Sequence, residues 1–539
     1  MASPPLAQVP EVVEVRWREL ALPDRDLLRV SEHMQAGRYS WLLDSAATDA
    51  RLGRYSFAGA DPYLVARVFG EEITLHCARP VRDFLAPGPS TVKGEFLGWL
   101  RGMLPAFDVD DRGLPVPLPL LGGAVGYWGY EWAEQIEAHV FHGRDELGLP
   151  DATMLFVDRL VAMDHATGRC FAVALGFGCE REKAAARAEE ALSSLSAGLE
   201  VLERSPLAIP ESTPEGTGSP ARPELLATRI PPNIEASFDA AGYQARVIEL
   251  KEEIAAGNIY EANLTRRMDL PFEGDVWALY RALRRASPAP FASFIDLGEV
   301  SILGSSPERF LRVSAEGDVE SRPIKGTRPR GRSAQEDSAL EADLACSEKD
   351  RAENLMIVDL VRNDLGRVCA LGSVQVPELM TVERYASVFQ LVSSVTGKLG
   401  RGNDRFDLVA SAFPPGSMTG APKIAAMRLL DGLEPVRRGV YSGALGYLDV
   451  RGGMDLAVVI RTLMVRRGRV HLHTGGAVVA DSDPRQEYEE SLDKARAMFA
   501  ALEAVARAGR SRQNPSGGRA GSFPPEQGIV SENAPGVSR

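Results

Sequence analysis

The 539-residue sequence predicts a protein that combines β-strands with α-helices. Strand-like runs include ATMLFVDRLVAMD and CFAVALGF, whereas the alanine- and glutamate-rich stretch EREKAAARAEEALSSLSAGLEVL is typical of a helix. The segments GGAVGY (122–127) and SGALGY (442–447) share a Gly-Ala-x-Gly-Tyr core. Two such strands in equivalent places would indicate a pseudo-repeated sheet, although coincidence between glycine-rich strands explains a match over five positions equally well.

Composition narrows the class of protein. A chain of this length can form two or more cores or one large interwoven core. Its 45% hydrophobic and 25% charged residues are ordinary for a soluble globular protein. The formal charge of -13 argues against a dedicated nucleic-acid binder, which usually carries a basic domain. No apolar run approaches the roughly 20 residues that span a bilayer, so we expect no membrane association.

Cysteine usage and the N-terminus indicate the compartment. The first residues lack a basic segment followed by an apolar one, so no signal peptide is expected. The five cysteines are dispersed without C-x-x-C spacing, which favours reduced thiols over disulfides or a zinc site. We therefore expect a cytoplasmic protein.

Four regions are expected along the chain. They are an N-terminal region at 1–204, a linker rich in Pro, Ser and Gly at 205–235, a catalytic region at 236–508 and a disordered tail at 509–539. The catalytic region opens with a helix, because apolar residues recur at helical spacing between Tyr243 and Ile254.

Lys325 lies in the turn-forming stretch SRPIKGTRPRG (321–331), which is rich in arginine. Most charge runs are solvated, so a basic surface loop or a phosphate patch is one interpretation. The other is a lysine that loses its proton easily, because neighbouring cations favour the neutral amine. The cations in question are Arg322, Arg328, Arg330 and Arg332.

The flanking sequence predicts a β-hairpin. RFLRV and DVESRPI read as two strands around Glu316 and Gly317. With those two residues as the loop, Glu308 lies opposite Lys325, and cross-strand partners have Cβ atoms about 4.5–5.5 Å apart. A slip of one or two residues would still leave them close. The pair is either a cross-strand salt bridge or a carboxyl group and an amine that face one reaction site.

Two predicted helices each offer a glutamate. Ser347 is the expected N-cap of a helix that carries Glu353, and Asp483 with Pro484 opens a helix that carries Glu490. Each glutamate alone reads as a solvated side chain. Together they could hold one magnesium ion, which keeps several waters and needs only one or two protein carboxylates.

Arg461 interrupts the apolar run MDLAVVIRTLMV. A charge in such a run is rarely buried without an anionic partner. The turn RRGR pairs this strand with VHLHTGG, which places Arg461 opposite Thr474 and beside Gly475 and Gly476. Glycine lets backbone amides approach a ligand closely. The pattern favours a carboxylate-binding site over a structural ion pair.

These segments together resemble the chorismate-utilising enzymes, which include anthranilate synthase component I, aminodeoxychorismate synthase component I and the isochorismate synthases. The resemblance is strong over about 238–506, through PIKGTRPRG, AENLMIVDLVRNDLG, GSMTGAPK, YSGALGY, VVIRT and VADSDPRQEYEESLDKA. It is looser in the first block, through WLLDSA, GRYSFAG and GGAVGYWGYEW. The implied fold is α+β, with two large antiparallel sheets packed as a sandwich, helices around them and the site in a cleft between them.

Within this family, lysine in PIKGT is typical of aminodeoxychorismate synthases, whereas anthranilate synthases carry alanine there. The resemblance implies that the neutral Lys325 amine attacks chorismate at ring carbon 2 while the carbon 4 hydroxyl leaves. Ammonia then adds at carbon 4 and expels the lysine, which gives 4-amino-4-deoxychorismate for p-aminobenzoate and folate synthesis. Glu308 matches the family's proton donor for the leaving hydroxyl.

Further roles follow from the same resemblance. Glu353 and Glu490 match the magnesium ligands, and magnesium would neutralise the ring carboxylate of chorismate. Arg461 and Tyr441 would hold the enolpyruvyl carboxylate. The positions that match chorismate-binding residues are Gly326, Thr327, Tyr441, Arg461, Gly475, Gly476, Ala477 and Lys494. LLDSA and APFAS resemble the family's tryptophan pocket, with Ser45, Pro290 and Phe291 as its residues here.

Three positions depart from the family pattern. Ala477 replaces a third glycine, although it still offers its amide. Gln390 replaces a frequent histidine, so no imidazole is present there for proton transfer. Glu261 stands where glutamine is frequent and isochorismate synthases use lysine. The absence of that lysine argues against water addition.

The resemblance implies partners as well as a reaction. A glutamine amidotransferase would supply ammonia as a separate subunit, because no cysteine here lies in a nucleophile-elbow sequence. The expected partners are chorismate, ammonia and that subunit, without nucleic acid or membrane. Two alternatives stay open, namely anthranilate synthase component I and a catalytically silent paralogue that binds chorismate or tryptophan. The intact Lys325, Glu308 and paired glutamates speak against the silent paralogue.

Overall fold

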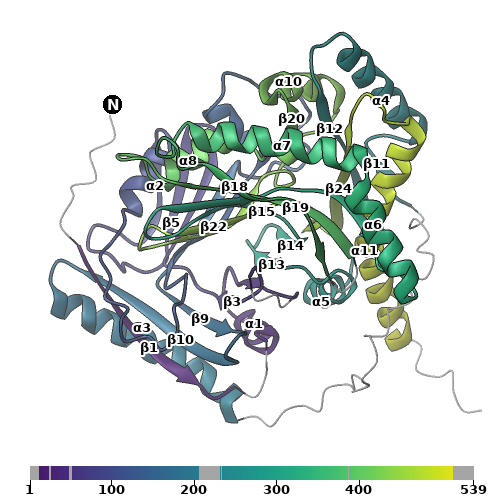
Figure 1. Cartoon of the computed structure of the whole chain (residues 1–539). Helices are drawn as coiled ribbons and strands as arrows, with labels where there is room; N and C mark the ends of the chain where they lie inside the picture. Colours follow the sequence, from purple (N-terminus) through teal and green to yellow (C-terminus); the bar gives the residue numbers. More distant parts are fainter. Residues whose placement is uncertain are drawn as a thin grey trace, which may run out of the picture.

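The computed structural model describes residues 11–22, 26–47, 51–204, 231, 233–385 and 388–513. Two antiparallel sheets of twelve strands each form the framework, and helices lie against them (Figure 1). The α+β sandwich expected from the sequence is therefore confirmed.

The first sheet runs from β1 to β11. Its strands in spatial order are β1 (Val12–Leu20), β10 (Arg169–Gly178), β9 (Arg159–Asp164), β3 (Tyr55–Gly59), β2 (Trp41–Asp44), β13 (Phe291–Asp296), β14 (Ser301–Ser306), β23 (Thr462–Arg466), β24 (Arg469–Val478), β12 (Glu261–Pro271) and β11 (Glu235–Ala236), and the short β20 (Gly420–Ala421) also pairs with β12.

The second sheet runs from β17 to β6. Its strands in spatial order are β17 (Ile324–Pro329), β19 (Val388–Lys398), β16 (Asp318–Arg322), β15 (Arg309–Val313), β22 (Met454–Val458), β21 (Ala444–Asp449), β7 (Gly123–Trp128), β8 (Ala152–Val157), β4 (Leu64–Phe69), β5 (Glu72–Cys77) and β6 (Gly88–Lys93), and β18 (Gln375–Arg384) also pairs with β19.

Both ends of the chain contribute to each sheet. β2 pairs with β13 in the first sheet, and β7 pairs with β21 in the second. The regions 1–204 and 236–508 thus share their sheets. Most of the linker expected at 205–235 lies outside the described residues. Of the tail expected at 509–539, the structure describes 509–513, which are the end of the last helix.

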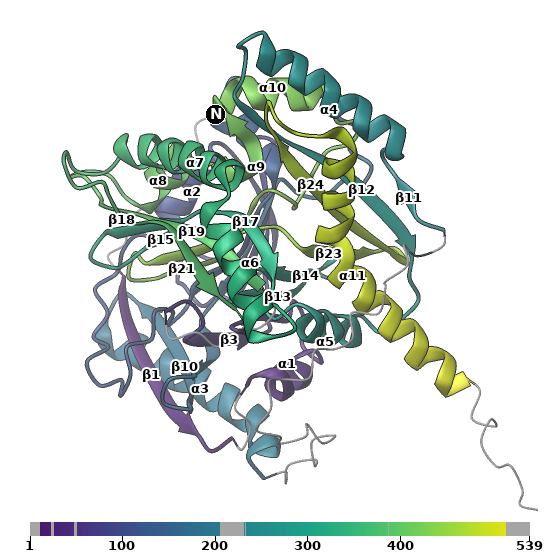
Figure 2. The same ribbon diagram turned by 45° about the vertical axis from the view of Figure 1, so that its right-hand side comes forward.

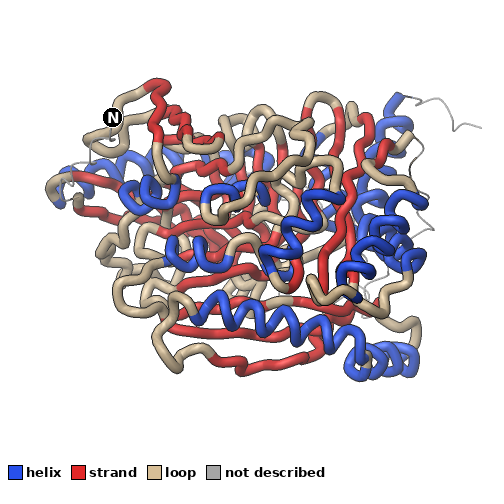
Figure 3. The backbone as a smooth tube through the Cα atoms, turned by 90° about the horizontal axis from the view of Figure 1, so that it is seen from above, coloured by secondary structure: helices blue, strands red, loops and turns tan. Residues whose placement is uncertain are grey.

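Helices cover the sheets on several sides. Figure 2 shows α11 running past α5, with α4 at its upper end, and Figure 3 shows helices outside the strands at the lower and right-hand sides of the view. The helices are α1 (Leu28–Met34), α2 (Phe96–Met103), the 3-10 helix η1 (Tyr130–Gln135), α3 (Arg181–Arg204), α4 (Ala240–Ala255), α5 (Val276–Ala286), α6 (Ala334–Cys346), α7 (Glu348–Gly366), α8 (Arg405–Ala412), α9 (Gly416–Thr419), α10 (Lys423–Leu433) and α11 (Pro484–Gln513).

The first sheet is covered on both faces, which explains its almost continuous apolar strands. One face packs on the second sheet, and the other packs on helices that include α3, α5 and α11. A strand that is buried on both faces has no need for the alternation of polar and apolar residues. Among the described residues, no helix is both long and apolar enough to cross a membrane.

N-caps fix the two helices that carry the expected metal ligands. The Ser347 hydroxyl accepts a hydrogen bond from the Asp350 amide at 3.3 Å at the start of α7. The Asp483 carboxylate accepts hydrogen bonds from the amides of Arg485 and Gln486 at the start of α11. Both predicted caps are confirmed, and each saturates amides that a helix leaves free.

The two similar glycine segments are neighbours in one sheet. β7 pairs with β21 so that Gly126 faces Gly446. A Cβ at Gly126 would lie 1.9 Å from the carbonyl oxygen of Thr153, so no larger residue fits there. Glycine is therefore required by the close approach of neighbouring strands.

We expect Gly126→Ala to lower the free energy of unfolding by about 2–3 kcal/mol, because the new methyl group overlaps the backbone of β8. The matched control is Gly198→Ala in α3, where a Cβ meets no atom within 4 Å. That change should be neutral or stabilising by up to about 1 kcal/mol, since alanine favours helix more than glycine does. Urea unfolding of the three proteins measures both effects. Equal midpoints would contradict the packing argument.

Candidate active site

Residues from both sheets and two helices meet around Lys325. β12 and β24 contribute from the first sheet, and β15 and β17 contribute from the second. α7 and α11 add acidic side chains. The structure thus brings most of the expected site residues into one region.

Lys325 forms a buried ion pair with Glu261. The lysine side chain is 9% exposed, and its Nζ lies 2.5 Å from Glu261 Oε1. Glu261 is fully buried at the start of β12, and its second oxygen, Oε2, has no hydrogen-bond partner among the described residues. The lysine is therefore no solvated surface residue. The contact with Glu261 was not expected from the sequence.

This partner reverses the expected charge state of Lys325. Burial alone would lower the pKa of Lys325, but the carboxylates of Glu261 and Glu353 outweigh it and raise the pKa above that of an ordinary lysine. The expectation that neighbouring arginines keep the amine neutral is wrong. Three of the four arginines are paired with carboxylates instead: Arg322 with Glu378 and Glu383, Arg328 with Asp343 and Asp350, and Arg330 with Asp337.

The hairpin that carries Glu308 forms, but its register differs from the prediction. The turn begins at Ser314, whose carbonyl accepts a hydrogen bond from Gly317, and an irregularity follows between Arg309 and Arg312. Arg309 therefore faces Arg322 of β16. Lys325 follows Arg322 by three residues and lies on β17. The expected direct opposition is wrong by one or two residues. The two side chains still lie close enough for Lys325 to act on the pKa of Glu308.

Glu308 is suited to carry a proton near neutral pH. Burial raises its pKa to about 7, although hydrogen bonds from the Ser417 hydroxyl and the Ile324 amide oppose that rise. A buried carboxyl of this kind can donate a proton to a leaving group. Ser417, in the short helix α9 before β20, was not identified from the sequence because nothing in GSMTG places it beside Glu308, more than a hundred residues earlier.

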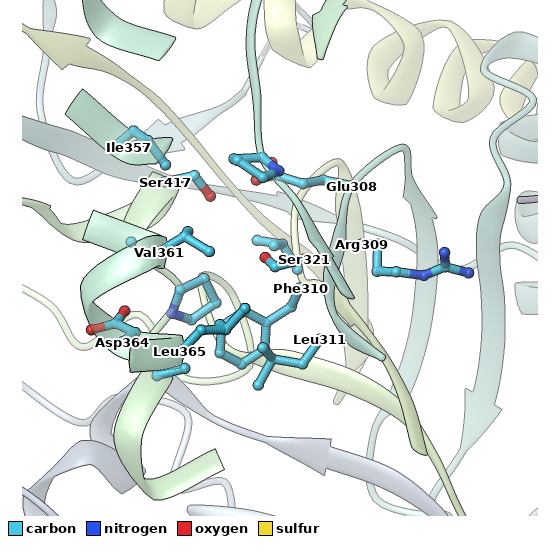
Figure 4. Close-up of a pocket in the computed structure, with 15 residues that line it drawn as sticks. Glu308, Arg309, Phe310, Leu311, Ser321, Ile357, Val361, Asp364, Leu365 and Ser417 are labelled. Atoms are coloured by element: carbon cyan, nitrogen blue, oxygen red, sulfur yellow. The ribbon is translucent and has the colours of Figure 1, made fainter. Parts of the chain in front are cut away.

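A small cavity lies beside Glu308 (Figure 4). Glu308 and Ser417 lie at one end, and Ile357, Val361 and Leu365 of α7 contribute apolar surface. These apolar neighbours explain the desolvation of the carboxyl group. The Arg309 side chain points away from the cavity. Outside the cavity its guanidinium pairs with the Asp455 carboxylate at 2.9 Å.

Glu353 and Glu490 approach from two helices. Burial raises the pKa of Glu353 to about 7, and the nearby Glu490 contributes to that rise. Lys494 lies 2.8 Å from Glu490 and holds the pKa of that carboxyl below its usual range. Within 4 Å of the Glu353 carboxylate, the described residues place one cation, Lys349, at 3.8 Å.

The donor set suits magnesium better than a metal that needs a full protein cage. Among the described residues, no three His, Cys, Asp or Glu side chains form a metal-binding cluster. Two carboxylates of different helices, both oxygen donors, are sufficient for an ion that keeps water and substrate oxygens in its shell. Glu353 and Glu490 therefore fit magnesium on the chemistry of their oxygens.

Glycines bring the acidic helix close to β24. A Cβ at Gly476 would lie 2.9 Å from Glu487 Oε2, and Lys494 donates a hydrogen bond to the Gly475 carbonyl at 2.9 Å. Glu487 and Lys349, whose side chains lie 3.0 Å apart, are part of this cluster. Ala477 follows on the same strand and faces Asn263 of β12.

β23 and β24 pair in the register that the turn predicts, with Leu463 opposite Leu472. The pairing ends there, and Arg461 precedes β23, so its direct opposition to Thr474 is not formed. The Arg461 backbone lies in the left-handed region, with φ 49°. Burial lowers the pKa of its guanidinium, and the described residues place no carboxylate within ion-pair distance of it. An anionic ligand would supply the missing charge.

Tyr441 is held by stacking on His473. Their ring centroids are 5.1 Å apart, with 14° between the planes. Both side chains are buried, and burial raises the pKa of the Tyr441 hydroxyl. His473 was not identified from the sequence, where HLH read only as a strand.

Gly326 and Thr327 follow Lys325 on β17. Gly326 has φ 81°, and a Cβ there would lie 2.8 Å from the Asp350 side chain, so glycine is required. Thr327 faces Gln390 across the β17·β19 pair. Gln390 thus lies next to the turn that presents the lysine.

A second cavity, of about 380 Å³, lies away from Lys325. Its lining includes the three residues expected in a tryptophan pocket, Ser45, Pro290 and Phe291. The Ser45 hydroxyl donates a hydrogen bond to the Tyr55 carbonyl at 2.6 Å. Asp44, which precedes it, is bonded to Arg284 at 2.5 Å.

The chain is similar to known proteins over most of its length. Residues 63–500 match the family model described as chorismate binding enzyme. The aminodeoxychorismate synthase of Streptomyces griseus is 42% identical over 479 residues, which are 89% of this chain and 62% of that protein. The chain thus spans less than two thirds of that relative.

Two anthranilate synthases are similar over most of their length. Component 1 from Pseudomonas aeruginosa is 38% identical over 484 residues, which are 86% of this chain and 90% of that protein. The crystal structure of component I from Streptococcus pneumoniae TIGR4 superposes with a TM-score of 0.67 and 29% identity, and the match covers 84% of this chain and 93% of that one.

The raised pKa of Glu308 predicts a pH-dependent stability. The folded state favours its protonated form, so this contribution is fully present below pH 4.5 and is lost as the pH rises through about 7. The wild-type protein should therefore lose free energy of unfolding between pH 5 and pH 8.5, and Glu308→Gln should lose about 2–3 kcal/mol less over the same range. Urea unfolding at several pH values measures this. The surface variant Glu182→Gln should keep the wild-type dependence, and an unchanged slope in Glu308→Gln would refute the assignment.

Proposed function

The chain belongs to the chorismate binding enzyme family, and from this membership we propose that it aminates chorismate with ammonia to 4-amino-4-deoxychorismate. The observation that carries the proposal is the buried amine of Lys325 beside Glu308 and the two glutamates of α7 and α11. The similarity to a protein named aminodeoxychorismate synthase supports it.

The proposed reaction has two steps. The Lys325 amine forms a bond to ring carbon 2, the double bond shifts, and the bond from carbon 4 to its hydroxyl oxygen breaks. Glu308 donates the proton with which that oxygen leaves as water. Ammonia then bonds to carbon 4, the bond between carbon 2 and Lys325 breaks, and the proton of the new ammonium group returns to Glu308.

Binding groups surround this chemistry. Arg461 and Tyr441 would hold a carboxylate of chorismate, because a half-buried guanidinium without a counter-ion favours an anion. Gly326, Thr327, Gly475, Gly476, Ala477 and Lys494 would line the remaining surface. Glu353 and Glu490 would hold magnesium, which would supply positive charge against the ring carboxylate when bound.

Several wider features belong to the same proposal. Ammonia would come from a glutamine amidotransferase partner, and the product would serve p-aminobenzoate and folate synthesis. The cavity of Ser45, Pro290 and Phe291 would be a tryptophan pocket. A cytoplasmic location agrees with five cysteines that are all free.

Anthranilate synthase component I is the second candidate. The Pseudomonas aeruginosa protein of that name is covered over 90% of its length. Anthranilate synthesis adds ammonia at carbon 2, which is the atom that Lys325 would occupy. A lysine in this place therefore favours amination at carbon 4.

We expect the purified chain to form aminodeoxychorismate from chorismate, ammonium and magnesium, and Lys325→Ala to lower that rate at least 100-fold. Loss of a covalent nucleophile removes the low-barrier route to the product. Chromatography that separates aminodeoxychorismate, anthranilate and isochorismate measures the outcome. Anthranilate as the main wild-type product would instead support the second candidate, and binding of chorismate without turnover would support a silent paralogue.

We also expect Arg461→Gln to raise the KM for chorismate by about 10- to 100-fold, because a charged hydrogen bond to the carboxylate contributes about 1.5–3 kcal/mol. Steady-state rates over a range of chorismate concentrations measure this. Arg18→Gln is the control, since Arg18 pairs with Glu203 on the distant β1 and α3 face. An unchanged KM in Arg461→Gln would remove this arginine from the binding site.

A further inference from the structure

The proposed reaction needs a neutral amine, whereas the structure holds Lys325 against a buried carboxylate. The carboxylate of Glu261 lies 2.5 Å from the lysine nitrogen. A charge-assisted hydrogen bond of this length favours the charged forms of both partners. The site must therefore contain a means of removing the proton once substrate is bound.

Glu261 is rigidly placed for this task. It is the first residue of β12 and pairs with Ala421 of β20, and the next residue, Ala262, pairs with both Gly420 and Val478. The side chain is fully buried, so its carboxylate cannot turn into solvent. Its distance to the lysine nitrogen is within the range for direct proton transfer.

We propose that Glu261 is a catalytic residue, the base that takes the proton of Lys325 before attack and returns it after the lysine is released. This inference rests on the proposed amination of chorismate. One proton moves from Nζ to the carboxylate, which leaves a neutral amine and a neutral carboxylic acid. The nitrogen lone pair then forms the bond to ring carbon 2. When that bond breaks, the amine recovers its lone pair and then the proton from Glu261.

The other charged groups around Lys325 have different tasks. Glu308 is bonded to Ser417 and Ile324 and supplies the proton of the leaving hydroxyl. Glu353 of α7 and Glu490 of α11 influence the lysine at longer range, and neither lies within 4 Å of its nitrogen. On α10, which follows β20, Lys423 is bonded to Asp364 at 2.9 Å. Among the described residues, Glu261 is thus the carboxylate in contact with the amine.

The free oxygen of Glu261 supports the same role. Oε2 is buried without a hydrogen-bond donor among the described residues. This oxygen can therefore receive a proton without the loss of an existing hydrogen bond. A purely structural counter-ion would be expected to have both oxygens satisfied.

The test compares Glu261→Gln with wild type over a range of pH. The amide keeps the size of the side chain and a hydrogen bond to Lys325, but it cannot accept the proton. We expect the rate of aminodeoxychorismate formation at saturating ammonium to fall at least 100-fold at pH 7. In the variant the proton of Lys325 must instead leave to solvent, and the fraction of neutral amine rises about tenfold per pH unit. The ratio of the variant rate to the wild-type rate should therefore rise about tenfold for each unit of pH.

Glu261→Asp keeps a carboxylate on a shorter stem. It should restore part of the rate, and its ratio to wild type should be independent of pH. This conservative variant also tests the proposal if Glu261→Gln fails to fold. A ratio of the Glu261→Asp rate to the wild-type rate that changes with pH would itself overturn the proposal. Glu203→Gln, remote from the site, should match wild type throughout.

The outcomes separate this inference from the function on which it rests. A wild-type rate in Glu261→Gln, or a loss that is equal at every pH, would overturn the role of Glu261 and leave the amination intact. A wild-type protein that makes no aminodeoxychorismate would overturn both.

Discussion

Charges that lie between two close-packed sheets must be neutralised inside the protein. The catalytic region contains several buried ion pairs, including Lys325 with Glu261, Lys423 with Asp364, and Arg438 with Glu434. Removal of one partner from such a pair is costly, because the other charge stays buried and unpaired. Among the described residues, the guanidinium groups of Arg266, Arg405 and Arg461 have no carboxylate within ion-pair distance.

Sequence reasoning succeeded where a feature depends on a few adjacent residues. The N-caps of α7 and α11 are confirmed, because a cap involves only neighbouring amides. The register of β23 and β24 is confirmed, because the turn RRGR fixes it directly. The hairpin at Glu316 was wrong by one or two residues, since its turn begins at Ser314 and its strand is irregular beyond it.

Sequence reasoning failed where a property depends on distant residues. Lys325 was expected to be neutral because arginines adjoin it in sequence, yet three of them face their own carboxylates. Glu261, which controls its charge, lies 64 residues earlier in the chain. Ser417, which bonds to Glu308, comes from the short helix α9. Family resemblance identified Lys325 and Glu308, whereas only the fold reveals their partners.

The pairing of β7 with β21 has a consequence for how the molecule is made. Gly126 emerges from the ribosome long before Gly446, its neighbour in the finished sheet. Until then β7 has one exposed edge, and unpaired strand edges invite aggregation. During much of translation the nascent chain would thus contain an incomplete sheet with an exposed, aggregation-prone edge. Binding of a molecular chaperone to that edge would protect the chain until β21 is made.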